Sequence, residues 1–595
     1  MKIEGMGAMP HAKGTAFRVW APNVQKASVI GEFNDWKANK TPMKAEDDGN
    51  WYANATEAKP GQEYRFHFVT ADGEITRIDP RARKVTNSIG NGVIEDPEFN
   101  WGEDDFKIPA WNELVIYEMH IGTFNDLTPD NDSAASFKNC KRKLAHLKKL
   151  GVTAVEIMPI AEFAGERSWG YNPAHIYAVE SSYGGPKGFK QFIKEAHKQG
   201  IAVILDVVYN HFGPSDLNLW KFDGWSENEG GGIYFYNDER AATPWGNTRP
   251  DYGRKEVREY IRDNALMWLE EYHVDGLRFD GSVYIRRVDG PGDKDLPDGW
   301  TLMQWLNSEI KSWFPGAITI AEDLQSSEWL TKSVEEKGAG FGSQWDARFV
   351  HPIRQSVTAA EDESRSMESV ANAISSLYNG EATQRVIYSE SHDEVANGKA
   401  RVPQEVDGKN PKSWIAQKRS TLAASLVMTS PGIPMLFQGQ EFLQDKWFED
   451  TFPLDWDLAE SFRGIVLLYR DLISMRLNRK NSTEGLMGNE VRVHHIDEEK
   501  NLVAFHRWKN GGSGDDVVVV ANFSAEIREE CAIGFPNVGV WKLRYNSDAE
   551  SYSDLFSGFF SGDAVATAKE CDGYPSQGIV HVAPYSVLVF SQDRA

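Results

Sequence analysis

Three acidic residues in the middle of the chain stand where apolar segments end. Asp280 and Glu322 are the last residues of two such segments, and Asp393 follows a third. Arg278 precedes Asp280 by two positions, so in an extended strand both side chains leave the same face. At the end of a barrel strand, an arginine in this place would keep the aspartate ionised in an active site. The pair is also compatible with a structural ion pair.

Carboxyl groups arranged in this way can cleave a glycosidic bond with retention of configuration. One carboxylate attacks the anomeric carbon while a second, protonated group donates to the leaving oxygen, and the two lie about 5–5.5 Å apart. A third carboxylate can stabilise the transition state. We expect Asp280 to be the nucleophile, and Glu322 then needs surroundings that raise its pKa. His211 and His392 could donate to sugar hydroxyls, with a structural role as the alternative for each.

The elements that would position these residues alternate between apolar strands and amphipathic helices from residue 106 to 485. The expected strands are 114–120, 155–160, 201–206, 276–280, 317–322, the region of Trp345, 385–391 and 433–437. One expected helix covers 134–150, with Phe137, Leu144, Leu147 and Leu150 on one stripe. This order predicts an α/β fold, a (β/α)₈ TIM barrel, in which polar residues at the carboxyl ends of the strands share one pocket.

Three further segments complete the predicted organisation. The long segment 207–250 is rich in Gly and aromatic residues, and its length indicates a functional loop rather than a simple connection. Residues 1–105 contain short alternating strands separated by Gly and Asp, which predicts an N-terminal β-sandwich. In residues 486–595 the helical period disappears and alternating strands return. We therefore expect a C-terminal antiparallel β-sandwich.

Composition narrows the classes of partner. The chain has 595 residues and a net charge of −24. This negative charge would repel the phosphates of nucleic acid, and a neutral substrate fits it better than a nucleic acid does. Aromatic residues make up 12% and include 20 Trp, an enrichment that suits sugar binding and also large cores. The three cysteines, Cys140, Cys531 and Cys571, are scattered, which indicates a reducing compartment. We find no signal-peptide or membrane-spanning stretch and expect a cytoplasmic protein.

Four short motifs resemble the signature regions of the α-amylase superfamily, glycoside hydrolase family 13. They are DVVYNH (206–211), GLRFD (276–280), IAED (320–323) and SHDE (391–394). The resemblance implies that Asp280 is the nucleophile, Glu322 the acid/base and Asp393 the transition-state stabiliser. It also implies that the sugar being cleaved is bound by Asp206, His211, Arg278, His392 and the loop carrying Trp169 and Tyr171, with the tyrosine stacked on the sugar.

Within that superfamily, two subgroups share most of the sequence features. The segments 158–190 and 206–214 and the TPWG motif (243–246) resemble both glycogen-branching enzymes and maltooligosyl-trehalose trehalohydrolases. SHDEVANGK (391–399) looks like the branching-enzyme form of its motif. The N-terminal FRVWAPNVQKASVIGEFNDW and RIDPRAR resemble the carbohydrate-binding family 48 module that precedes many α-glucan enzymes. Many amylases carry a histidine shortly after the nucleophile, and here Gly281 to Tyr284 contains none.

These features favour a 1,4-α-glucan branching enzyme that acts on glycogen, amylose or maltooligosaccharides. The alternatives are an α-1,4-glucan hydrolase, amylase-like or releasing trehalose, and a catalytically silent glucan-binding protein. We expect no cofactor, since the chain has neither a phosphate-binding Gly-rich loop nor a Cys/His metal cluster. Asn210 matches a calcium-binding position of amylases, but the loop offers no clear further set of oxygen ligands, so we expect no essential metal. We also expect a monomer.

Overall fold

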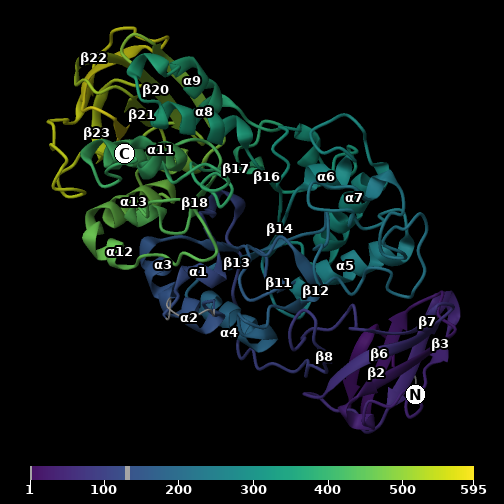
Figure 1. Ribbon diagram of the computed structural model, residues 1–595. Helices are drawn as coiled ribbons and strands as arrows, with labels where there is room; N and C mark the ends of the chain where they lie inside the picture. The colour runs from purple at the N-terminus through teal and green to yellow at the C-terminus, as the bar shows by residue number, and fades with distance from the viewer. Residues whose placement is uncertain (1–2, 128–133, 595) are drawn as a thin grey trace.

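Eight parallel strands close into a barrel at the centre of the molecule (Figure 1). The computed structural model describes residues 3–127 and 134–594. Around the barrel the strands follow chain order and close between the last and the first. They are β9 (Ile116–Met119), β10 (Ala154–Ile157), β13 (Ala202–Val207), β14 (Gly276–Phe279), β15 (Ile318–Ala321), β16 (Ser343–Trp345), β17 (Arg385–Ile387) and β18 (Ile433–Phe437). The predicted (β/α)₈ barrel is confirmed.

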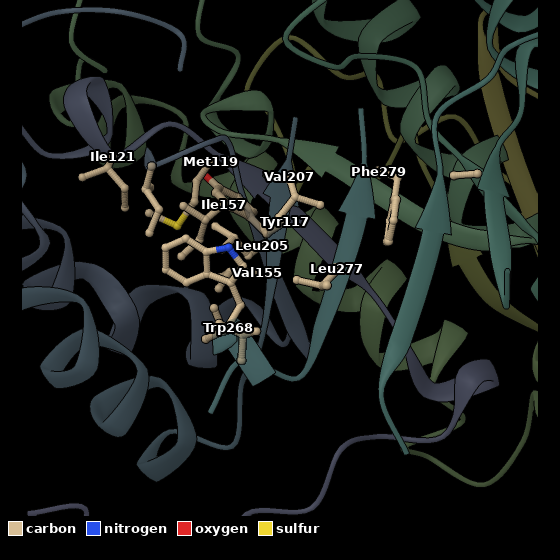
Figure 2. Packing of buried hydrophobic residues seen from close by; sticks show 14 of the residues in the cluster. Tyr117, Met119, Ile121, Val155, Ile157, Leu205, Val207, Trp268, Leu277 and Phe279 are labelled. Carbon is tan, nitrogen blue, oxygen red and sulfur yellow. The ribbon is translucent and has the colours of Figure 1, made fainter. Parts of the chain in front are cut away.

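Alternation along each strand separates the two faces of the barrel wall. Outward-facing side chains such as Val155, Leu205 and Leu277 pack beneath the helices, where Trp268 of α5 (Lys255–Glu270) lies against them (Figure 2). The inward-facing side chains form a separate apolar cluster that includes Ile204. Two residues further toward the carboxyl end of the strand this inner face becomes charged, as where Asp206 follows Ile204 in β13. The same period of two that builds the core therefore delivers ionisable groups to one end of the barrel.

The helix expected over 134–150 is interrupted. The structure has a short α2 (Phe137–Cys140), a 3₁₀ turn (Lys141–Lys143) and α3 (Leu144–Leu150). Asn125 Nδ2 donates to the backbone oxygen of Asn139 at 2.6 Å, and this competes for a carbonyl that a continuous helix would use. The predicted apolar stripe survives the break, because all four of its residues are buried.

The N-terminal part is a β-sandwich at one end of the molecule (Figure 1). One sheet has the order β1-β2-β5-β4 and the other β3-β6-β7, with β8 paired to β6. The strands are β1 (Gly7–His11), β2 (Gly14–Trp20), β3 (Lys26–Gly31), β4 (Lys44–Ala45), β5 (Asn50–Ala55), β6 (Glu63–Thr70), β7 (Gly73–Arg77) and β8 (Gly92–Val93). Asn23 Nδ2 donates to Asp223 Oδ2 at 2.8 Å, and Arg77 donates to the backbone oxygens of Lys221 and Phe222. The sandwich is thereby fastened to the long loop after β13.

The C-terminal part is an antiparallel β domain at the opposite end (Figure 1). Its larger sheet has the order β19-β20-β21-β26-β23-β24, and β22 pairs with β25. The strands are β19 (Glu490–Asp497), β20 (Leu502–Trp508), β21 (Val517–Asn522), β22 (Arg528–Phe535), β23 (Gly539–Asn546), β24 (Ala564–Ala566), β25 (Ser576–Val582) and β26 (Ser586–Ser591). No helix in residues 3–127 and 134–594 combines the length and the apolar character needed to cross a membrane.

A buried ion pair joins the C-terminal domain to the barrel. Lys418 of α11 (Trp414–Thr429) lies 2.6 Å from Asp548, and their side chains are 0% and 1% exposed. We expect Lys418→Ala to lower the free energy of unfolding by about 3–5 kcal/mol, because it leaves a buried carboxylate without its counter-charge. Urea unfolding followed by circular dichroism measures the change. The matched control is Arg463→Ala in the exposed pair with Glu460, which should have no measurable effect. A similar loss in both variants would contradict the prediction.

Candidate active site

The predicted acids gather at the carboxyl end of the barrel. Asp206 lies within β13, Asp280 directly follows β14 and Glu322 directly follows β15. These three strands are neighbours in the barrel. Asp393 is in the turn beyond β17, where it lies 3.7 Å from the His392 ring and keeps a 49% exposed side chain. The side chains of Asp280 and Glu322 are each 13% exposed, so the pair is partly buried yet open to a substrate.

Arg278 connects the carboxylates. Its Nη1 donates to Asp206 Oδ2 at 2.7 Å and to Asp280 Oδ1 at 3.0 Å, and its Nη2 is 3.8 Å from Glu322 Oε2. The guanidinium lies 4.3 Å from the centre of the Trp345 ring. Burial opposes its charge, but the surrounding carboxylates outweigh burial and raise the pKa of Arg278. Arg278 and Asp280 are therefore both an ion pair and parts of one site.

Two donors orient the Asp280 carboxylate. Arg278 binds one oxygen, and Asn210 Nδ2 donates to the other at 2.6 Å and to the Asp280 backbone oxygen at 2.8 Å. This arrangement leaves the carboxylate little freedom to rotate. Fixed orientation is what a nucleophile needs to attack in line with the leaving group.

Glu322 occupies different surroundings. Burial raises its pKa to about 7, with Arg278 acting in the opposite direction and the negative charges of Asp280 and Asp393 adding to the increase. The backbone N–H of Gly281 donates to Glu322 Oε2 at 2.6 Å. A large share of the Glu322 side chains is therefore protonated near neutral pH, as a general acid requires. Two carboxyl groups held by one arginine are thus suited to opposite tasks.

The raised pKa of Glu322 predicts how the activity falls at alkaline pH. The protonated form of Glu322 must donate to the leaving oxygen, so we expect kcat/KM to fall about tenfold per pH unit above pH of about 7. Burial also raises the pKa of Asp206 to about 7. Arg278 opposes this increase, and the charge of Asp280 adds to it. An α-maltosyl fluoride substrate separates the two groups, because fluoride leaves without a proton. If the same alkaline fall persists with the fluoride, it does not arise from Glu322.

The remaining predicted residues line the same end of the barrel. The Tyr171 ring stacks on His392 with centroids 4.9 Å apart, and its hydroxyl donates to Asp206 Oδ2 at 2.6 Å. The Trp169 and His392 rings are nearly perpendicular, with centroids 6.0 Å apart. His211 is buried, and burial lowers its pKa. The structure thus brings all nine predicted site residues together: Tyr171, Trp169, Asp206, His211, Arg278, Asp280, Glu322, His392 and Asp393.

The buried polar atoms at this end that have no hydrogen-bond partner among the described residues include one on Asp206 and one on His211. These two atoms are Asp206 Oδ1 and His211 Nε2. Leaving such atoms unpaired is costly, by about 1–3 kcal/mol each. Hydroxyl groups of a bound sugar can satisfy both, since a hydroxyl donates as well as accepts.

Glu118 is a residue of the site that the sequence motifs do not include. This residue of β9 accepts a hydrogen bond from the His392 backbone N–H at 3.1 Å, and its other oxygen pairs with His392 Nδ1. Burial works against the charged imidazole, but Glu118 and Asp393 outweigh it and raise the pKa of His392 to about 9. The sequence feature that could have identified Glu118 is an acidic residue on the inner face of an apolar strand. Glu156 of β10 shows the same feature. Burial raises the pKa of Glu156.

Asn210 lies beside the nucleophile candidate, where its amide donates to Asp280. Within residues 3–127 and 134–594, no group of three or more His, Cys, Asp or Glu side chains is placed to hold a metal ion. The expectation that the protein needs no metal stays a prediction.

Comparisons with known proteins match all three parts of the chain. Residues 122–223 and 218–460 match the family "Alpha amylase, catalytic domain", residues 5–82 match "Carbohydrate-binding module 48 (Isoamylase N-terminal domain)", and residues 493–593 match "Alpha amylase, C-terminal all-beta domain". The barrel match alone covers more than half of the chain. The chain therefore belongs to the α-amylase family, glycoside hydrolase family 13, as its motifs predicted.

Relatives extend along nearly the whole chain. The 1,4-alpha-glucan branching enzyme GlgB of Kitasatospora aureofaciens is 31% identical over 95% of this chain and 75% of its own length. The enzyme of the same name from Oceanobacillus iheyensis is 29% identical over 97% of this chain and 93% of its own length. Among solved structures, pullulanase type I of Bacillus subtilis complexed with maltose has a TM-score of 0.77 at 22% identity, covering 100% of this chain and 86% of that one. A putative alpha amylase from Salmonella typhimurium has a TM-score of 0.74 at 23% identity, covering 99% and 100%. The two structures show the shared fold alone.

Proposed function

We propose that this protein is a 1,4-α-glucan branching enzyme. The observation that carries the proposal is the pair Asp280 and Glu322 on neighbouring strands: Arg278 and Asn210 orient the Asp280 carboxylate, while burial raises the pKa of Glu322 to about 7. Similarity to branching enzymes over nearly the full chain supports this choice over an α-1,4-glucan hydrolase.

In the proposed first step, Asp280 attacks the anomeric carbon of an α-1,4-linked glucose. The bond between that carbon and the oxygen at position 4 of the next glucose breaks, and Glu322 gives its proton to the departing oxygen. The product is a glycosyl ester on Asp280 and a glucan with a new free 4-hydroxyl. Asp393 would stabilise the positive charge that develops on the sugar ring between the two states.

In the second step, the ionised Glu322 accepts the proton of a 6-hydroxyl on an acceptor glucan. The oxygen then attacks the anomeric carbon from the opposite side, an α-1,6 bond forms and Asp280 is released as a carboxylate. Two inversions give net retention. Water in place of the acceptor would give hydrolysis, so the acceptor must compete with water for the ester.

The proposed sugar contacts have physical support. The Tyr171 hydroxyl donates to Asp206, so its ring lies next to that carboxylate, and stacking on aromatic rings is typical of sugar binding. Asp206 Oδ1 and His211 Nε2 are the unpaired atoms that sugar hydroxyls would satisfy. The proposed substrates are glycogen, amylose and maltooligosaccharides.

The proposed setting is the cytoplasm, with a monomer as the active form. Cys140, Cys531 and Cys571 are free thiols, which is compatible with a reducing compartment. One chain supplies every residue of the candidate site. We further propose domain limits near residues 105 and 485, in the intervals between β8 and β9 and between α13 (Arg463–Arg476) and β19.

Amylose with no branches tests the proposed function. We expect incubation with the protein to shift the iodine-stain maximum to shorter wavelength while few reducing ends appear. Subsequent digestion with an α-1,6-specific debranching enzyme should then release short linear chains. Reducing ends without new α-1,6 linkages would instead identify a hydrolase and contradict the proposal.

A further inference from the structure

Two aromatic side chains stand beside the carboxylates and have no part in the two steps above. Trp245 belongs to the long loop after β13, and 43% of its surface is exposed. Its ring stacks on His211 with centroids 4.6 Å apart. Tyr284 of α6 (Ser282–Arg286) meets the Trp245 ring at 5.0 Å and an interplanar angle of 74°. The two rings therefore form a corner, and we refer to Trp245 and Tyr284 as the aromatic corner.

Local hydrogen bonds hold the two backbone segments that carry these rings. A tight turn carries Trp245, in which the Thr243 backbone N–H and hydroxyl both donate to the Gly246 oxygen, at 2.9 and 2.8 Å. The helix that carries Tyr284 directly follows Gly281. The Gly281 N–H donates to Glu322 Oε2, and the Ser282 hydroxyl donates to the Glu322 backbone oxygen at 2.9 Å. Tyr284 is thus positioned by the same segment that holds Glu322.

The position relative to Glu322 determines which sugar the corner can contact. Glu322 protonates the leaving oxygen and later accepts the proton of the incoming hydroxyl, so both the departing and the incoming glucans lie on its side of the site. Burial, with a contribution from the charge of Glu322, raises the pKa of Tyr284, in agreement with their closeness. An exposed indole at this place presents an apolar face of the kind on which sugar rings stack.

We propose that Trp245 and Tyr284 form the acceptor subsite, which binds the α-glucan chain whose 6-hydroxyl attacks the glycosyl-Asp280 ester. This inference rests on the proposed branching function. The aromatic faces would stack on acceptor sugar rings and exclude water from the side of the ester that Glu322 serves. The corner would thus set the balance between transfer and hydrolysis, which the four catalytic motifs do not determine.

The test is the ratio of α-1,6 linkages formed to reducing ends released from amylose, measured by ¹H NMR and a reducing-end assay. We expect Trp245→Ala and Tyr284→Ala each to lower this ratio about tenfold. Trp245→Phe, which keeps an aromatic face, should stay within about threefold of the wild type. The ratio is informative because loss of folded enzyme lowers both products equally. An unchanged ratio in both alanine variants would overturn the proposal.

A matched control and the wild type complete the design. Trp313 ends α7 (Pro297–Trp313) and is 69% exposed, so Trp313→Ala removes an exposed indole away from the carboxylates and should leave the ratio unchanged. A wild type that forms no α-1,6 linkages would refute the proposed function itself. A wild type that forms them, with the same ratio in the Trp245 and Tyr284 alanine variants, would refute the acceptor subsite alone.

Discussion

Replacing Asp280 with asparagine should reduce glucan cleavage by about 10⁴-fold or more, because an amide oxygen cannot form the glycosyl ester. The substitution is nearly isosteric. The amide keeps one acceptor oxygen, which Arg278 can still bind, and Asn210 can still donate to the backbone oxygen of the same residue, so the fold should be retained. Initial rates on amylose measure the effect, and circular dichroism checks folding.

The control for this substitution is Asp554→Asn, which makes the same chemical change at an exposed position of the C-terminal domain and should leave the rate unaltered. If Asp280→Asn retained a tenth or more of the wild-type rate, the nucleophile would have to be another carboxylate.

The second large effect is expected for Glu322→Gln. On amylose the rate should fall by about 10²–10⁴-fold, since the leaving oxygen no longer receives a proton. On α-maltosyl fluoride the first step should be far less affected, because fluoride needs no proton. The ester would then accumulate, since no base activates the acceptor hydroxyl or water.

Added azide distinguishes loss of the acid/base from general damage to the site. Azide attacks without giving up a proton, so it should restore turnover of the fluoride by Glu322→Gln and yield α-maltosyl azide. Equal losses on amylose and on the fluoride, with no response to azide, would rule out Glu322 as the acid/base.

The carboxylate pair was predictable from sequence because it depends on local periodicity. The spacing of Arg278 and Asp280 places them on one face of a strand, and Glu322 ends the next strand in chain order. In a parallel barrel, consecutive strands end at the same rim, so these residues must meet. The assignment of Glu322 as general acid requires a raised pKa, since that group must be protonated. In the structure, burial and neighbouring charges raise it.

Contacts that depend on barrel closure were not predictable in the same way. Glu118 reaches His392 across 274 positions of sequence because β9 closes the barrel against β18. The length of the segment 207–250 predicted a functional loop but gave no indication that a turn at Thr243 would stack Trp245 on His211. The break after Cys140 likewise depends on Asn125, which lies outside the helical pattern. Each of these contacts joins a residue to a group elsewhere in the chain, so the local sequence pattern does not contain it.

The most direct test of the mechanism is mass spectrometry of the covalent intermediate. Glu322→Gln would be incubated with α-maltosyl fluoride, quenched in acid and digested with trypsin. Cleavage after Arg278 and Arg286 yields the peptide FDGSVYIR, in which Asp280 is the sole acidic side chain. We expect this peptide to carry one maltosyl unit. A maltosyl unit on the peptide of Asp393 or Asp206, or an unmodified enzyme that still turns over the fluoride, would contradict the assignment of Asp280 as nucleophile.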